Sequence, residues 1–245
     1  AKAGIPVVLL EKDLSWVKPC GGALPPVAFD EFDIPETLIS RKVHNAKIHS
    51  PSERTANIRV TGLEDRHNDY VAMACREDLD PFLRQRAVAN GATLIEARLT
   101  GLEVEADGVM ATYMPKDSRK PETLRVQAVI GADGAYSTTA KLLGLPRIPL
   151  CVAIQERIRL PDDVMQNWAD TAHLYLGQRV SPDLYAWVFP KADHVAVGLG
   201  AGPGKTREMR QHLTNLKQRI AREIEGGEIY MEEAYALPIH PRDQM

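Results

Sequence analysis

The sequence has little cysteine, few aromatic residues and no long apolar run. Its three cysteines, Cys20, Cys75 and Cys151, are widely spaced, and no CxxC pair occurs. A disulfide framework and a zinc cluster are therefore not expected, and a reducing compartment fits best. No apolar segment is long enough to cross a bilayer as a helix, and no secretory signal is recognised.

Patterns for nucleic acid, metal and phosphate loops are also missing. The net charge is −3, so nucleic acid is not expected as a partner. The seven histidines show no HxxxH or HExxH spacing, so no metal site is expected. The segment VGLGAGPGKT (197–206) fails as a phosphate loop because the GxxxxGK pattern requires glycine where Leu199 stands. Basic residues between 205 and 222 are interleaved with glutamates, which favours a solvated helix face over a membrane surface.

The first half of the chain has an α/β pattern. IPVVLLEK (5–12) is an apolar, β-branched run, which predicts a strand buried on both faces of a parallel sheet. YVAMACR predicts a strand that leads into a helix, in which Pro81 is tolerated in the first turn and Gly91 is the stop. Turn signals separate further predicted strands: NAKIHSP, TANIRV, ATLIEA, LTGLEVE, VMATYMP and LRVQAVIGADG, the last three as a meander.

The second half is predicted to be mainly antiparallel. Turn residues separate four predicted strands, CVAIQERIRL, AHLYLGQ, LYAWVFP and HVAVGLG. A helix with an apolar stripe follows in TREMRQHLTNLKQRIAREIE. An α/β half followed by an antiparallel half indicates two interleaved subdomains.

Three short segments contain residues suited to binding a ligand or cofactor. In VKPCGGALPP (17–26), Gly21 and Gly22 permit backbone angles and close approaches that a Cβ forbids, and flanking prolines stiffen them. Glu11 is at the end of its predicted strand. In dinucleotide-binding folds an acidic residue at this position binds the ribose of the adenosine. The common alternative is a glutamate that is simply exposed to solvent at the end of a strand. In VIGADGAYST (129–138), Asp133 stands between small residues, which would let a ribose or phosphate group come close to its carboxylate. The alternative interpretation is an ordinary Asp-Gly turn between a strand and a helix.

These segments together resemble a known family. After the strand that ends at Glu11 come KPCGGA, CREDLDPFLRQRA, IGADGAYS and YAWVFPK, in this order and over nearly the whole chain. They resemble the geranylgeranyl reductases, flavoproteins of the p-hydroxybenzoate hydroxylase-type superfamily. KPCGGA and YAWVFP are more specific than the shared GADG element. The resemblance is closest to the chlorophyll and bacteriochlorophyll branch, which saturates a geranylgeranyl tail to phytyl.

The resemblance implies the cofactors FAD and NADPH and a role for each matched residue. The implied cofactor-binding residues are Glu11, Lys12, Gly21, Gly22, Arg76, Asp133 and Gly134. Cys20 would lie beside the flavin as a candidate proton donor, although a buried, inert thiol is the alternative. The implied isoprenoid-binding residues, for which core packing is the alternative, are Tyr185, Trp187, Phe189 and Pro190.

The resemblance also implies a fold and shows a departure from the family. The expected fold class is α/β (α+β): residues 1–149 form a partial, Rossmann-like FAD-binding domain with inserted strands near 42–75, and residues 150–245 a substrate-binding antiparallel sheet plus helix. In strand order 3-2-1-4-5, IPVVLLE is strand two, TLIEA strand three and QAVIGAD strand four. Strand one and the glycine loop are not recognised. We therefore expect an internal fragment that binds flavin weakly.

The expected function is reduction of isolated C=C bonds in a geranylgeranyl diphosphate or a geranylgeranyl-chlorophyll-type lipid. Such an enzyme would be cytoplasmic, with peripheral association with a photosynthetic membrane as a further expectation. Two alternatives stay open: a flavin monooxygenase of the aromatic hydroxylase type, and a non-catalytic fragment that binds a lipid or a partner.

Overall fold

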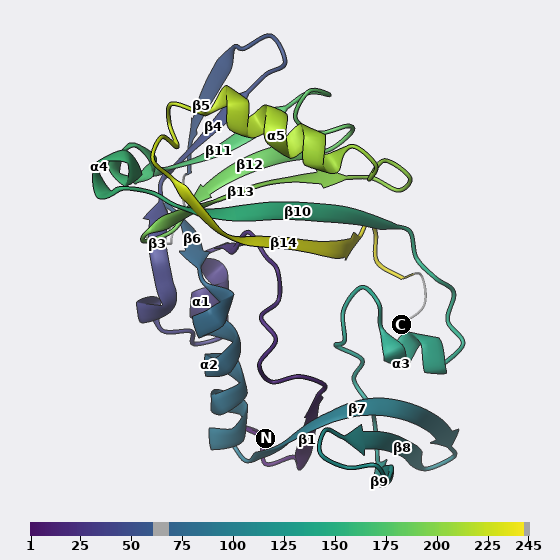
Figure 1. The fold of residues 1–245 in the computed structure, drawn as a ribbon. Helices are drawn as coiled ribbons and strands as arrows, with labels where there is room; N and C mark the ends of the chain where they lie inside the picture. Colours follow the sequence, from purple (N-terminus) through teal and green to yellow (C-terminus); the bar gives the residue numbers. More distant parts are fainter. Residues whose placement is uncertain (61–68, 243–245) are drawn as a thin grey trace. The chain divides into compact units, whose positions relative to one another are not determined.

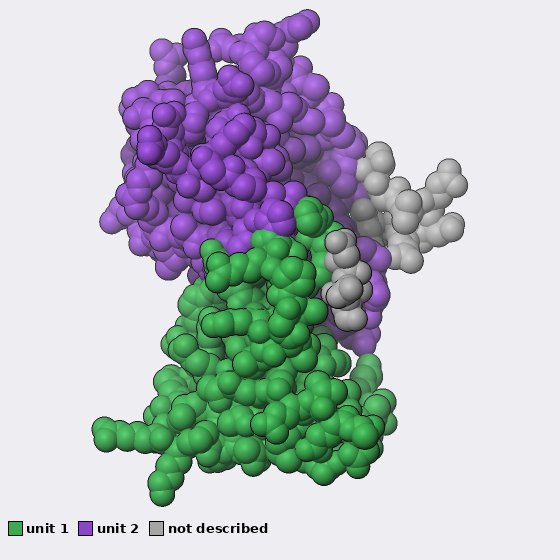
Figure 2. All heavy atoms as spheres, turned by 90° about the vertical axis from the view of Figure 1, so that its right-hand side faces the viewer, with its two compact units in different colours: residues 1–18, 80–148, 240–245 green, residues 19–79, 149–239 purple. Residues whose placement is uncertain are grey.

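Three β-sheets form the framework of the chain in the computed structural model, which describes residues 1–60 and 69–242 (Figure 1). The chain divides into two units, which Figure 2 colours separately. Unit 1 comprises residues 1–18, 80–148 and 240–245, and unit 2 comprises residues 19–79 and 149–239.

The predicted domain boundary after residue 149 lies next to one of the observed unit boundaries, between residues 148 and 149. The strands near 42–75, predicted as inserted into the first domain, lie in the segment 19–79, which groups with the second half of the chain. Residues 61–68 and 243–245 of the predicted domains lie outside the described part. The assignment of flavin and substrate roles to the two domains stays a prediction.

Unit 1 is built on a four-stranded sheet with the order β1-β7-β8-β9. Strand β1 pairs in parallel with β7, and β7, β8 and β9 form an antiparallel meander, whose last strand overlaps the predicted strand LRVQAVIGADG only at residues 124–126. The predicted strands ATLIEA and LTGLEVE are one continuous strand, with an irregularity between Leu99 and Gly101. The strands are β1 (Val7–Glu11), β7 (Ala92–Glu105), β8 (Gly108–Pro115) and β9 (Glu122–Val126); the helices of this part are α2 (Arg76–Ala89), which begins in unit 2, and α3 (Thr138–Leu142).

Two expectations for this sheet are wrong. Strand β1 lies beside β7 at the edge of the sheet, as expected with strand one unrecognised, but it was predicted to be buried on both faces and has Val7 39% and Val8 36% exposed. Residues 127–133, predicted as strand four, form no strand, and Ile130 is 90% exposed. A strand requires a neighbour for its backbone hydrogen bonds. Within the described residues no strand pairs with 127–133 or with the outer edge of β1.

Unit 2 contains a seven-stranded sheet with the order β14-β10-β13-β12-β11-β4-β5 and a small sheet with the order β2-β6-β3. All four strands predicted for the second half are present, and the two strands predicted around residue 50 pair as a hairpin. The large sheet comprises β4 (Asn45–His49), β5 (Thr55–Arg59), β10 (Leu150–Arg159), β11 (Thr171–Leu176), β12 (Tyr185–Pro190), β13 (His194–Ala201) and β14 (Glu228–Pro238).

Shorter elements complete unit 2. The small sheet comprises β2 (Ala23–Leu24), β3 (Ile39–Val43) and β6 (Val71–Ala74). Two short α-helices and two 3-10 turns are α1 (Val27–Glu31), α4 (Asp162–Met165), Glu36–Leu38 and Gln166–Trp168. The sequence prediction missed β14, because consecutive glutamates interrupt its alternation, and it also missed β3 and α1.

The core of unit 2 lies between the large sheet and helix α5 (Met209–Arg219), which runs across one face of this sheet (Figure 1). The predicted apolar stripe is confirmed, since Met209, Leu213 and Leu216 are buried on the sheet side. Strand β13 is buried along its whole length. No helix among residues 1–60 and 69–242 has the length and apolarity that a bilayer span needs.

Strand β10 sends charged side chains to both faces of the large sheet. Successive residues of a strand point to opposite faces. Glu156 points to the helix side, where its Oε2 lies 2.7 Å from the Lys217 Nζ of α5. Gln155 and Arg157 point to the other face, where both donate to the carboxylate of Glu233 on β14.

Arg157 is the centre of a buried ion network on that second face. Its Nε lies 3.0 Å from Glu233 Oε2, and Nη1 donates to Glu77 at the start of α2. The side chains of Arg157 and Glu233 are each only 7% exposed. Burial alone would lower the pKa of Arg157, but the hydrogen bonds to Glu77 and Glu233 raise it above its ordinary value. Each ion in this network therefore depends on its partners to remain charged inside the protein.

A second titratable cluster lies where β4 meets β11. The ring of His49 stacks on Tyr175 with centroids 4.1 Å apart, and its Nε2 lies 3.2 Å from His173 Nδ1. Burial lowers the pKa of both histidines to about 4, helped by Arg219 and Lys47 for His49 and by His49 and Lys47 for His173. Both rings are therefore neutral at pH 7.

These histidines should make unit 2 sensitive to acid. Their pKa is lower in the folded state than the ordinary value of 6.5, so between pH 6.5 and about 4 the unfolded chain binds more protons. The unfolding free energy should therefore fall as the pH is lowered through this range, as urea titrations at several pH values would measure. His173→Phe should flatten the dependence, and His212→Phe on α5, which removes a ring that contacts the carbonyl of Arg179, is the matched control. An equally steep dependence in His173→Phe would contradict this explanation.

The ion network predicts a contrast between neighbouring glutamates. Glu233→Ala should cost about 3–5 kcal/mol of unfolding free energy because it leaves Arg157 buried with an incomplete set of partners. Glu232→Ala removes an exposed pair with Arg210, whose side chain is 84% exposed, and should cost less than about 1 kcal/mol. Urea unfolding of both variants measures the difference, and equal losses would contradict the prediction.

Candidate functional site

The segment at residues 20–22, here called the glycine turn, packs on the aromatic strand β12. A Cβ on Gly21 would lie 3.0 Å from the ring of Phe189 and 3.6 Å from Trp187 Nε1. Gly22 has φ +71°, and a Cβ there would lie 2.2 Å from the carbonyl oxygen of Ala74. Both positions therefore require glycine for packing within the protein itself, in addition to any approach by a ligand.

The carbonyl groups of the glycine turn are all held by hydrogen bonds. Gln155 Nε2 donates to the carbonyl of Cys20 at 3.2 Å, and Lys191 Nζ donates to that of Gly21 at 2.7 Å. The carbonyl of Gly22 accepts from the backbone N–H of Ala74 at 2.8 Å. Side chains from β10 and from the end of β12 thus fix the turn against the large sheet.

The predicted alignment of three aromatic residues along one strand is confirmed. Tyr185 and Trp187 have ring centroids 6.0 Å apart, and Trp187 and Phe189 have centroids 6.1 Å apart, so the rings share one face of β12. Pro190 is buried at the next position, which points to the opposite face. The structure therefore groups the aromatic rings with the glycine turn and places Pro190 apart from them.

The indole of Trp187 occupies space that a glycine leaves open. Four residues on neighbouring strands lie opposite one another in one row: Glu233 on β14, Gln155 on β10, Gly198 on β13 and Trp187 on β12. A Cβ on Gly198 would lie 2.4 Å from the Trp187 ring and 2.7 Å from Gln155 Cβ. Trp187 is 8% exposed, and its buried Nε1–H has no hydrogen-bond partner among the described residues.

A small cavity, large enough for about one water molecule, lies under the glycine turn. Its lining includes Cys20, Cys75, Glu77, Lys191 and His194. Burial raises the pKa of Cys75 and lowers that of Lys191, to about 8 for the lysine. Burial also lowers the pKa of His194, although the hydrogen bond with Asp193 opposes this effect. Cys20 is therefore surrounded by buried polar groups and not by a purely apolar core.

The residues assigned to the dinucleotide lie in several places. Glu11 ends β1, and its carboxylate accepts from the backbone N–H of Asp13 at 3.3 Å. Lys12 follows, with its Nζ 5.4 Å from the ring centre of Trp16. Arg76 is the first residue of α2 and lines the small cavity of unit 2. The cofactor roles of these residues stay predictions.

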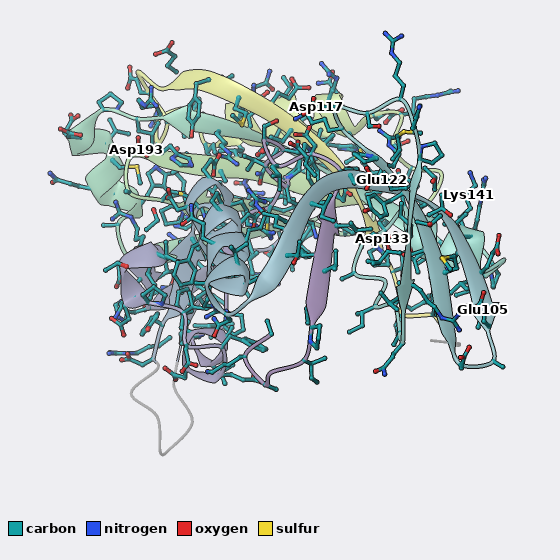
Figure 3. All side chains as sticks on the ribbon, turned by 90° about the horizontal axis from the view of Figure 1, so that it is seen from below. Glu105, Asp117, Glu122, Asp133, Lys141 and Asp193 are labelled. Carbon is teal, nitrogen blue, oxygen red and sulfur yellow. The ribbon has the colours of Figure 1, made fainter. Side chains whose placement is uncertain are left out.

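Asp133 is the acceptor that organises the start of α3 (Figure 3). Its Oδ1 accepts from Ser137 Oγ at 2.5 Å, and its Oδ2 accepts from the backbone N–H of Thr139 at 2.9 Å. Burial alone would raise the pKa of Asp133, but these hydrogen bonds lower it below its ordinary value. Gly134 has φ +80°, which explains the glycine after Asp133. The carboxylate thus fixes one end of the segment 130–134, whose residues are all exposed.

Several residues of this site were not found from the sequence. They are Gln155, Arg157, Lys191, Gly198 and Glu233. Polar residues inside the otherwise apolar segment CVAIQERIRL were the available signal for a polar buried face. Nothing in the local sequence indicated that Lys191 reaches the carbonyl of Gly21.

Comparison with family models gives two matches that together cover most of the chain. Residues 1–158 match the FAD binding domain, and residues 151–235 match the geranylgeranyl reductase catalytic domain. The predicted cofactor FAD is confirmed at the level of the family.

Curated relatives carry one recurring name. Proteins named geranylgeranyl diphosphate reductase from Synechocystis and Rhodobacter capsulatus are 41% and 34% identical to the chain over 98% and 99% of its length. A chloroplastic protein of the same name from Arabidopsis thaliana is 38% identical over 99% of the chain. The chain covers 60%, 60% and 53% of these three proteins, so it spans between half and two thirds of the relatives' length.

Solved structures have the same fold. A geranylgeranyl bacteriochlorophyll reductase-like protein from Thermoplasma acidophilum superposes with a TM-score of 0.81 over 98% of this chain and 62% of that chain, at 24% identity. The p-nitrophenol 4-monooxygenase of Pseudomonas putida superposes with a TM-score of 0.70 at 19% identity, over 96% of this chain and 62% of that chain. The mixed α/β fold class is therefore confirmed. These findings confirm the resemblance to geranylgeranyl reductases: the chain belongs to the family of FAD-binding domains matched by residues 1–158, and its residues 151–235 match the geranylgeranyl reductase catalytic domain.

Proposed function

We propose that the protein is an FAD-dependent reductase that saturates isolated C=C bonds of a geranylgeranyl chain, with NADPH as the electron donor. The observation that carries this proposal is the contact between the glycine turn and the rings of Trp187 and Phe189. The two motifs most specific to the reductases, KPCGGA and YAWVFP, meet in that contact. The names of the relatives support the same activity.

The described residues fit a flavin dinucleotide by their chemistry. Glu11 offers a carboxylate for ribose hydroxyls, with Lys12 beside it, and the exposed segment 130–134 offers peptide groups next to Asp133 and Gly134. Arg76 would provide a cation for the pyrophosphate. When bound, FAD supplies the hydride that reduces the alkene.

The protein's own task is to hold an alkene that has no polar group near the reacting carbons. Tyr185, Trp187 and Phe189 present an aromatic face that suits an isoprenoid and excludes water. Cys20 directly precedes Gly21, which packs on Phe189, and it carries an S–H group, so it is our candidate for donating a proton to the carbon next to the one that receives hydride. The flavin ring would approach the peptide backbone of Gly21 and Gly22, whose Cβ positions the protein itself fills.

We place this activity in the formation of the phytyl tail of chlorophyll-type pigments, because relatives from plants are chloroplastic proteins. The lipid substrate implies work at the surface of a photosynthetic membrane. Helix α5 offers little purely basic surface for such contact, since Arg210 pairs with Glu232 and Lys217 with Glu156. Attachment would therefore depend on the substrate more than on this helix.

A direct assay tests the reaction. The complete gene product, given FAD, NADPH and either geranylgeranyl diphosphate or a geranylgeranyl-esterified chlorophyll pigment, should yield products heavier by two hydrogens for each double bond reduced. Mass spectrometry of the lipid measures this gain and identifies which of the two substrates is used. Oxygen-dependent consumption of NADPH with a phenolic substrate, and no lipid reduction, would instead support an aromatic hydroxylase.

The proposed role of Cys20 makes a separate prediction. Cys20→Ser should lower kcat by roughly 100-fold, the usual lower bound for loss of a general acid, and change the distribution of partly reduced products. Cys151→Ala is the matched control, because Cys151 is buried on β10 and its Sγ contacts the carbonyl of Leu237. Unchanged kcat and product distribution in Cys20→Ser would remove this thiol from the mechanism.

A further inference from the structure

Lys191 is a buried cation whose nearest strong acceptor is a backbone carbonyl. The residue follows β12, is 3% exposed, and has no carboxylate within ion-pair distance among the described residues. Its Nζ donates to the carbonyl of Gly21 at 2.7 Å and lies 3.9 Å from Met73 Sδ. Burying an unpaired ammonium group is costly, so this arrangement needs an explanation beyond packing.

The contact with Gly21 leads directly to a sulfur atom. The carbonyl of Gly21 and the N–H of Gly22 belong to the same peptide group. That N–H donates to Cys20 Sγ at 3.3 Å. A single peptide group therefore joins the ammonium of Lys191, on its oxygen side, to the sulfur of Cys20, on its nitrogen side.

We propose that Lys191 is a positioning residue that acts on the sulfur of Cys20 through the peptide group between Gly21 and Gly22. A positive charge on the carbonyl oxygen draws electron density from the peptide and makes its N–H a stronger donor. A stronger N–H donor stabilises negative charge on sulfur and fixes its orientation. The proposal concerns the thiol itself and holds whether or not the protein reduces an alkene.

The surrounding structure holds this peptide group in place. A Cβ on Gly22 would lie 2.5 Å from Lys191 Nζ, so only glycine lets the ammonium group approach. The preceding peptide is held by Gln155 Nε2, which donates to the carbonyl of Cys20. The contact between Gly22 and Ala74 fixes the following peptide. The peptide between Gly21 and Gly22 therefore has little freedom to rotate away from either partner.

The ammonium group of Lys191 has no direct ion-pair partner among the described residues, but a charged network lies nearby. Arg157 pairs with both Glu77 and Glu233, so these three side chains together carry one net negative charge. Burial lowers the pKa of Lys191 to about 8, with a smaller contribution from Arg157, and the charges of Cys75, Cys20 and Glu77 oppose this shift. His194, which also lines the cavity, is neutral at pH 7 because burial lowers its pKa. At neutral pH the ammonium form of Lys191 therefore predominates.

The test is the rate at which iodoacetamide alkylates Cys20 between pH 6 and 9 in the complete gene product. Peptide mass spectrometry separates Cys20 from Cys75 and Cys151. Lys191→Met should slow alkylation of Cys20 at pH 7 about fivefold and move the pH profile to higher pH, because the thiolate is the reactive form. Lys191→Arg, which keeps a positive charge, should restore most of the rate.

Two further variants complete the experiment. Lys205→Met removes an exposed lysine of the same unit, 3.7 Å from Asp183, and should leave the Cys20 profile unchanged. Lys191→Gln keeps a neutral donor near Gly21 and should slow alkylation about threefold, which provides a test if Lys191→Met fails to fold. Loss of a merely structural contact would expose the sulfur and speed alkylation. An unchanged or faster rate in a folded Lys191→Met or Lys191→Gln variant would overturn the proposal.

Discussion

The close approach of the glycine turn to the aromatic face of β12 is the constraint on which the rest of the site depends. Gly21 lies against the ring of Phe189, and Gly22 lies against both Ala74 and Lys191, at distances that no side chain at these positions would permit. The same approach brings the backbone carbonyls within reach of Gln155 and Lys191. The same packing brings the N–H of Gly22 to the sulfur of Cys20 and the ammonium group of Lys191 to the carbonyl of Gly21.

Strand β10 supports this arrangement because the side chains on its two faces bind different partners. On the helix side, Glu156 pairs with Lys217 of α5 and fastens the helix to the sheet. On the other side, Gln155 links the glycine turn to Glu233, and Arg157 links Glu233 to Glu77. Buried ions tolerate few rearrangements, since each is stable only with its partners. The network therefore fixes the face of the large sheet on which the glycine turn packs.

Local pattern was enough to predict many elements and some site residues. Helix α5, the hairpin of β4 and β5, and the shared face of Tyr185, Trp187 and Phe189 follow from periodicity within a few residues. The predictions failed where the outcome depended on a distant partner. Residues 127–133 have strand-like sequence but no neighbouring strand among the described residues, and β14 has interrupted alternation but pairs along β10.

By itself the sequence determined the family, the fold class and the glycines, thiol and aromatic rings of the site, because these are encoded in short contiguous motifs. Only the tertiary structure decided what those glycines contact, and that Asp133 organises the start of α3. The same holds for Lys191 and Gln155, which reach the glycine turn from positions more than a hundred residues away in the chain. The physical reason is that hydrogen bonds and burial depend on distances in space, which the register of β10, β13 and β12 sets.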